Sequence, residues 1–107
     1  MLNEDRFYII TLYDYYESLL TDKQQEYFKM YFFNDLSLAE IADEFKVSRA
    51  AIQDSIKKII KDLKYYEDNL QLYINAKRRL ALYEQIDNAA LKAKLFSLEQ
   101  RGKVNEK

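Results

Sequence analysis

Proline is absent from this chain of 107 residues, and glycine occurs once, at Gly102. Both residues interrupt helices, proline by removing a backbone donor and glycine by its conformational freedom. Their near-absence therefore favours helices joined by short polar turns. With 49% hydrophobic and 33% charged residues, the composition is globular. We expect an all-α protein.

The chain also lacks cysteine and histidine. Without them it cannot form disulfides, thiolate or histidine metal sites, or the catalytic triads and dyads that use histidine. No constellation of carboxylates or lysine suggests another chemistry, so we expect no catalytic residues, no metal site, no cofactor and no enzymatic activity. No segment approaches the roughly 20 apolar residues that span a bilayer, and the acidic N-terminus is unlike a signal peptide. We expect a cytoplasmic protein that does not contact membranes.

Apolar periodicity and capping residues predict the first two helices. The first runs from about 5 to 20, with an expected buried face of Phe7, Ile10, Tyr13 and Leu20, widened by Leu12, Tyr16 and Leu19. Thr21 begins the second, because Thr21 and Gln24 match a capping box, in which each side chain bonds the other residue's backbone N–H group. Asn34 and Asp35 favour turns and are expected to end it.

Residues 37–60 have the pattern of a helix-turn-helix. Ser37 and Glu40 form a second capping box that opens a short helix, and Ser48 caps the helix that follows. Two helices that cross over a short turn need a small side chain where their backbones meet, and Ala42 supplies it. The apolar residues expected behind the crossing are Ile41, Phe45, Val47, Ile52 and Ile56.

The second helix of this motif carries the residues expected to bind nucleic acid: Ser48, Arg49, Ala50, Gln53, Lys57 and Lys58. Such a recognition helix enters the major groove with its N-terminal residues toward the bases. Arg49 could bond guanine and Gln53 adenine, although Arg49 could equally contact a phosphate or pair with Glu44, and Gln53 could be an ordinary exposed residue. The lysines could follow a phosphate backbone or only keep the helix soluble. Asp54 is repelled by phosphates unless it accepts a hydrogen bond from cytosine.

The net charge of −1 conceals an uneven distribution. Residues 1–45 contain ten acidic and three basic residues, a net charge of −7, whereas residues 46–64 have a net charge of +4 and residues 65–107 a net charge of +2. Such asymmetry indicates a polyanionic partner, but it also fits a solvated helix face. The sequence pI of about 5.5 argues against strong DNA binding. The motif could therefore serve protein or RNA contact instead.

We place a helix-turn-helix domain at 1–65, a C-terminal helical extension at 66–101 and a disordered tail at 102–107. The apolar series of the recognition helix continues beyond its motif. Either one helix runs from 49 to about 86, or the helix kinks around 67–69.

A last helix is expected over about 88–100. The stretch before it repeats positions at alternating steps of three and four, which is a heptad seam interrupted by one charge: Ile56, Ile59, Leu63, Tyr66, Leu70, Tyr73, Lys77 and Leu80. Because a small core can cover only part of this seam, we expect a homodimer formed by the C-terminal extension. The rival arrangement is a monomer in which the last helix folds back over the seam.

Several motifs resemble known proteins. The pattern Ser37-Leu38-Ala39-Glu40-Ile41-Ala42 followed by Val47-Ser48-Arg49-Ala50-Ala51-Ile52 is similar to the promoter-reading helix-turn-helix in region 4 of bacterial sigma factors. Together with Tyr13-Asp14-Tyr15-Tyr16, Leu19-Leu20-Thr21-Asp22-Lys23-Gln24 and Asp54-Ser55-Ile56-Lys57-Lys58, it resembles the YlxM/p13 family of small bacterial proteins over about residues 7–85. The resemblance implies a sigma-region-4-like helical bundle, a regulatory role and an association with the signal recognition particle pathway.

We therefore predict a helix-turn-helix regulatory protein that binds nucleic acid, either DNA or RNA. The alternative is a protein- or RNA-docking accessory factor of the signal recognition particle that does not bind duplex DNA. One departure from the usual pattern is Lys46, which stands in the turn where many helix-turn-helices have glycine. A left-handed backbone at this lysine would cost about 1 kcal/mol relative to glycine.

Overall fold

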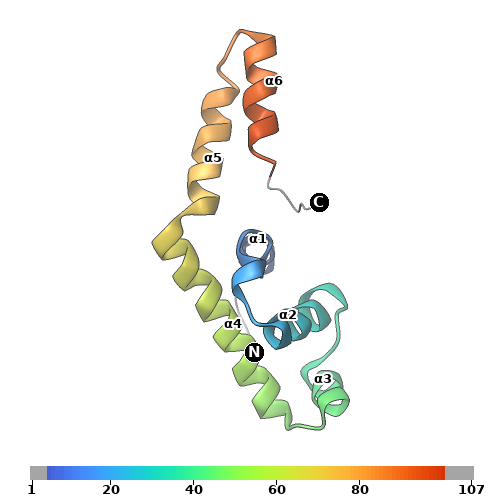
Figure 1. Cartoon of the computed structure of the whole chain (residues 1–107). Helices are drawn as coiled ribbons and strands as arrows, with labels where there is room; N and C mark the ends of the chain where they lie inside the picture. Colours follow the sequence, from blue (N-terminus) through green and yellow to red (C-terminus); the bar gives the residue numbers. More distant parts are fainter. Residues whose placement is uncertain (1–4, 101–107) are drawn as a thin grey trace. The chain divides into compact units, whose positions relative to one another are not determined.

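The structure is a computed structural model that describes residues 5–100 and is drawn in Figure 1. These residues lie in helices and in the short connections between them, so the all-α prediction is confirmed. The chain divides into two compact units between Gln71 and Leu72. The N-terminal unit contains the helix-turn-helix and extends to Gln71. The predicted tail, 102–107, lies outside the described residues.

The first helix, α1 (Arg6–Tyr16), is followed by a single 3₁₀ turn, η1 (Glu17–Leu19). Asp5 caps α1, because its carboxylate accepts hydrogen bonds from the backbone N–H groups of Phe7 and Tyr8. The segment predicted as one helix is therefore an α-helix with a tighter final turn.

The buried face of α1 differs from the predicted one. Phe7 is 78% exposed and Leu19 is 48% exposed, whereas Ile9 is fully buried. The buried side chains of α1 recur at steps of three and four, as one face of a helix requires: Ile9, Leu12, Tyr13 and Tyr16. Phe7 is out of phase with this series and falls on the opposite face.

The second helix, α2 (Asp22–Phe28), begins at the predicted capping box and continues as a short π-helix, η2 (Lys29–Phe33). The Thr21 hydroxyl accepts a hydrogen bond from the Gln24 N–H group at 3.1 Å, and the Gln24 side-chain oxygen accepts one from the Thr21 N–H group at 3.0 Å. Helical structure ends before Asn34–Asp35, as predicted. These local signals were sufficient to place the element.

The 22-residue helix α4 (Arg49–Leu70) is the centre of the N-terminal unit, and α1, α2 and α3 (Leu38–Phe45) all pack on it (Figure 1). Its buried apolar side chains are Ile52, Ile56, Ile59, Ile60 and Leu63. Aromatic rings join α1 to α2, where Tyr13 stacks on Phe28 with ring centroids 4.0 Å apart. Because each fully buried large apolar side chain contributes about 1.5–3 kcal/mol, this core holds the helix-turn-helix in place.

Helix α4 ends where Gln71 adopts a left-handed backbone, with φ 56° and ψ 33°. The single helix over 49–86 is therefore wrong, and the break lies beyond the kink considered around 67–69. Glu67 is buried and accepts a hydrogen bond from the Tyr16 hydroxyl at 2.5 Å, and α4 is still helical at that position. The first members of the predicted heptad seam are buried within the N-terminal unit: Ile56, Ile59 and Leu63.

The C-terminal unit is a hairpin of α5 (Leu72–Tyr83) and α6 (Ala89–Leu98). The predicted last helix is confirmed, and the Asn88 side chain caps it by accepting a hydrogen bond from the first turn. Tyr83 packs edge-on against Phe96 with ring centroids 5.4 Å apart, so α6 folds back on α5. No helix in the described part of the chain is both long enough and apolar enough to cross a membrane.

Candidate nucleic-acid interface

The first helix of the helix-turn-helix, α3, starts at the predicted capping box. The Ser37 hydroxyl accepts a hydrogen bond from the Glu40 N–H group at 3.0 Å, and the Glu40 carboxylate accepts one from the Ser37 N–H group at 2.8 Å. Ala42 is 4% exposed on the buried side of α3. A small side chain here permits the close crossing of α3 and α4 that the motif requires.

The turn between α3 and α4 is made by Lys46, whose backbone is left-handed with φ 57° and ψ 45°. Its N–H group donates to the Asp43 carbonyl at 3.3 Å, and the Val47 N–H group donates to the Ala42 carbonyl at 3.0 Å. A residue other than glycine in this conformation costs about 1–2 kcal/mol. The prediction that Val47 packs behind the crossing is wrong. Its side chain is 43% exposed, because it stands in the turn and not on a helix face.

Ser48 caps α4, and its hydroxyl accepts a hydrogen bond from the Ala51 N–H group at 3.0 Å. The Ser48 hydroxyl therefore already serves as a hydrogen-bond acceptor within the helix. Arg49 and Ala50 follow it and are exposed. The N–H groups of a first helical turn and the helix dipole favour negative charge nearby, so this end of α4 suits an anionic partner.

The exposed face of α4 lies opposite its buried residues. Its members recur at steps of three and four along the helix: Ala50, Asp54, Lys57, Lys58 and Lys61. Gln53 stands at the edge of this face and is partly buried. Lys61 was left out of the predicted site, although its spacing of four residues from Lys57 would have placed it there.

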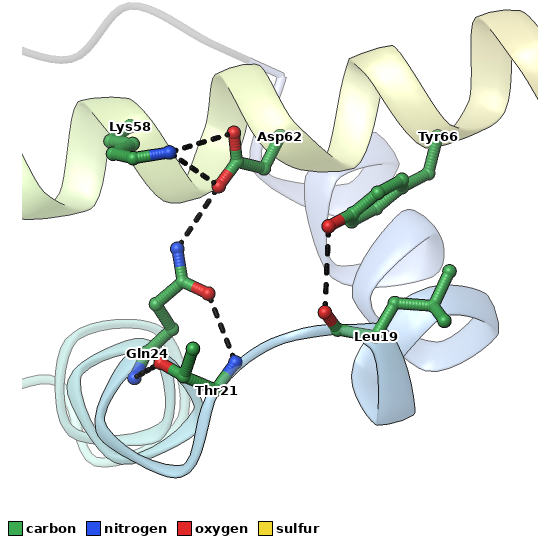
Figure 2. Close-up of polar contacts among 6 residues, drawn as sticks. All are labelled: Leu19, Thr21, Gln24, Lys58, Asp62 and Tyr66. Carbon is green, nitrogen blue, oxygen red and sulfur yellow. Dashed lines mark hydrogen bonds and ion pairs between the residues drawn. The ribbon is translucent and has the colours of Figure 1, made fainter.

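Lys58 belongs to a polar network that links α4 to the start of α2 (Figure 2). Its ammonium group donates to both carboxylate oxygens of Asp62, at 3.0 and 3.2 Å, and the Gln24 side chain donates to the same carboxylate at 3.0 Å. Further along α4, the Tyr66 hydroxyl donates to the Leu19 carbonyl at 3.4 Å. Lys58 is thus exposed, but Asp62 partly neutralises its charge.

Arg49, Lys57 and Lys61 form no ion pair with any residue that the structure describes. The pair between Arg49 and Glu44 that the sequence allowed is accordingly absent there. Across the same residues, no group of three or more metal-ligating side chains could hold a metal ion. The exposed face of α4 therefore offers unpaired cations to an anionic partner.

A second basic cluster, residues 77–79, lies on α5 and is largely engaged within the hairpin. The Arg79 guanidinium donates to Glu99 at 2.6 and 2.9 Å, and the Tyr83 hydroxyl donates to the same carboxylate at 2.6 Å. The hydrogen bonds from Arg79 and Tyr83 lower the pKa of Glu99 to about 2. Arg79 therefore fastens α5 to α6, and its charge is not free for a nucleic acid.

Comparison with known proteins agrees with the helix-turn-helix seen in the structure. A family model described as "Putative helix-turn-helix protein, YlxM / p13 like" matches residues 3–102. A UPF0122 protein of Ureaplasma urealyticum is 46% identical over 96 residues, which cover 89% of this chain and 97% of that protein. A UPF0122 protein of Lactococcus lactis is 47% identical over 76 residues, which cover 71% of this chain and 68% of that protein. A UPF0122 protein of Listeria innocua is 44% identical over 89 residues, which cover 83% of this chain and 80% of that protein. The family description names a fold and no enzymatic activity.

Proposed function

The chain belongs to the YlxM/p13-like family of helix-turn-helix proteins, and we propose that it is a non-enzymatic regulatory protein of the cytoplasm that binds duplex nucleic acid through the exposed face of α4. One observation carries the proposal. Three cations on or beside this face, Arg49, Lys57 and Lys61, have no ion-pair partner among residues 5–100. Unpaired cations at the start of a recognition helix suit the base edges and phosphates of a major groove.

The positions along α4 suggest separate roles. Arg49 stands in the first turn, where recognition helices meet the bases, and its guanidinium fits guanine. Lys57 and Lys61 lie further along the helix and would follow a phosphate strand, while Lys58 would contribute less because Asp62 shares its charge. Ala50 presents a methyl group that fits against thymine.

Titration of labelled duplex DNA and duplex RNA at several salt concentrations tests the proposal. Replacing Arg49 and Lys57 together by alanine should abolish binding but leave the fold intact, because exposed substitutions usually change stability by under about 0.5 kcal/mol. Any residual binding should show a log–log salt slope flattened by about 0.9 for each phosphate that the variant no longer neutralises. Lys77→Ala with Arg78→Ala removes the same charge from the C-terminal unit and serves as the control. Equal weakening by both double variants, or no duplex binding at low salt, would contradict the proposal.

A second candidate is an accessory factor that docks on the protein or RNA of the signal recognition particle and does not bind duplex DNA. The net charge of −7 over residues 1–45 favours it, since DNA-binding domains are usually basic. The family resemblance supports the choice of partner. Titration with the particle's purified RNA and protein, beside a random duplex, separates the two candidates. Tight binding to a particle component with no duplex affinity at any salt concentration would select the second.

We further propose a homodimer formed by the C-terminal unit. Several leucines of the hairpin are at least 48% exposed: Leu82, Leu91 and Leu98. Burying them against a second copy would be favourable, and twofold symmetry would let two recognition helices address adjacent half-sites. Light scattering of the full chain should give twice 12.9 kDa, and a chain ending at Gln71 should be monomeric. A mass of one chain across the micromolar range would rule the dimer out.

A further inference from the structure

Asp54 occupies the middle of the exposed face of α4. It lies one helical turn after Ala50 and one turn before Lys57 and Lys58, and all four residues are exposed. The residues two positions before and after it, Ile52 and Ile56, are buried in the core. A side chain between two inward-pointing positions of a helix points outward, so Asp54 faces any partner that approaches this surface.

The carboxylate of Asp54 has no role within the fold. It makes no hydrogen bond or ion pair with any residue that the structure describes. Lys58, which stands four residues later and could have paired with it, donates instead to Asp62. Asp54 also lies beyond the first turn of α4, where the helix dipole no longer favours an acid strongly.

An unpaired carboxylate among phosphate-binding cations needs a hydrogen-bond donor on the partner. In the major groove the base donors are the amino groups of cytosine and adenine. Adenine also presents its N7 acceptor beside the amino group, which repels a carboxylate, whereas cytosine presents the donor alone. We infer that Asp54 is a specificity-determining residue that selects cytosine, an inference that rests on the proposed binding of duplex nucleic acid by α4.

The experiment is a selection from random duplex DNA with the full chain and with Asp54→Asn, followed by sequencing. Asparagine both donates and accepts, which suits adenine. The wild type should enrich a site with one fixed cytosine, and Asp54→Asn should replace that cytosine by adenine. On the selected duplex, changing this cytosine should weaken wild-type binding by about 5- to 150-fold, the usual range for one base contact.

Asp43→Asn is the matched control. Asp43 lies on α3 and is exposed, and its carboxylate makes no hydrogen bond or ion pair with any residue that the structure describes. This substitution removes the same charge and should keep the wild-type base preference. An unchanged preference with Asp54→Asn would overturn the role of Asp54 while leaving the proposed function intact. If no duplex is enriched or bound by the wild type, the proposed function fails and this inference fails with it.

Discussion

The two units of the chain are held together in different ways. In the N-terminal unit, α1 to α4 bury a continuous set of apolar and aromatic side chains around α4. In the described part of the C-terminal unit, Ala76 alone is buried, and the hairpin is fastened by Arg79 and Tyr83 on Glu99 and by the contact of Tyr83 with Phe96. Apolar burial stabilises the first unit, and exposed charge-assisted hydrogen bonds stabilise the second, so the two should respond to different perturbations.

The largest effect should come from a cavity in the N-terminal core. Leu63 is fully buried on α4, and Leu63→Ala should lower the free energy of unfolding by about 2–5 kcal/mol. Leu72 on α5 is 44% exposed and is not among the leucines of the proposed dimer interface, so Leu72→Ala should change it by under about 0.5 kcal/mol. Urea unfolding followed by circular dichroism measures both. Equal losses in the free energy of unfolding would mean that an apolar core stabilises the hairpin as strongly as the N-terminal unit.

Overpacking the helix crossing should have the next largest effect. Ala42 is buried on the side of α3 that packs on α4, and Ala42→Leu should lower the stability of the N-terminal unit by about 1–3 kcal/mol. Ala39→Leu is the control, because Ala39 is exposed on the same helix. A thermal midpoint for Ala42→Leu within a degree or two of the wild type would contradict the role given to Ala42.

Acid should loosen the C-terminal unit through Glu99. Its pKa lies at about 2 instead of the ordinary 4.5, so the folded hairpin favours the charged carboxylate. The resulting stabilisation is complete above about pH 4.5 and is lost as the pH falls toward 2. The backbone amide signals of Ala89–Leu98 in nuclear magnetic resonance spectra should report this loss. In Glu99→Gln they should already indicate loosening at neutral pH.

Glu84→Gln is the matched control for this titration. Glu84 pairs with Lys92 at 3.3 Å in the same hairpin but is 67% exposed, and exposed pairs of this kind contribute little. Its replacement should leave the acid transition unchanged. If Glu84→Gln and Glu99→Gln shift the acid transition equally, the hydrogen bonds from Arg79 and Tyr83 to Glu99 are not what keeps α6 packed on α5.

Local chemistry made much of this fold predictable from the sequence. The capping residues Thr21, Ser37 and Ser48 satisfy N–H groups within their own helices, so no tertiary information was needed to find those helix starts. The phase of α1 was not predictable in this way. Phe7 and Ile9 are both apolar, and only the packing of α1 on α4 decides which is buried.

At the end of α4 and in the candidate site, some features also follow from local sequence and others do not. Glutamine is a good helix former, so nothing at Gln71 indicated its left-handed backbone. The exposure of Arg49 and Lys57 followed from helical spacing. Lys58 pairs with Asp62 four residues later on the same helix, a local contact that helical spacing allows. The hydrogen bond from Gln24 to Asp62 instead requires α2 to lie on α4, a contact between segments far apart in the sequence.

The smallest effect should come from the left-handed residues that end α3 and α4. Lys46→Gly relieves about 1–2 kcal/mol of backbone strain but adds about 0.4–1 kcal/mol of entropy to the unfolded chain. The N-terminal unit should therefore gain between about 0 and 1.6 kcal/mol. Gln71→Gly should gain less, because the last residues of α4 are exposed and can relieve the strain by fraying. Urea midpoints of the two variants test this, and an equal gain at Gln71 would show that the end of α4 is as firmly held as the turn of the helix-turn-helix.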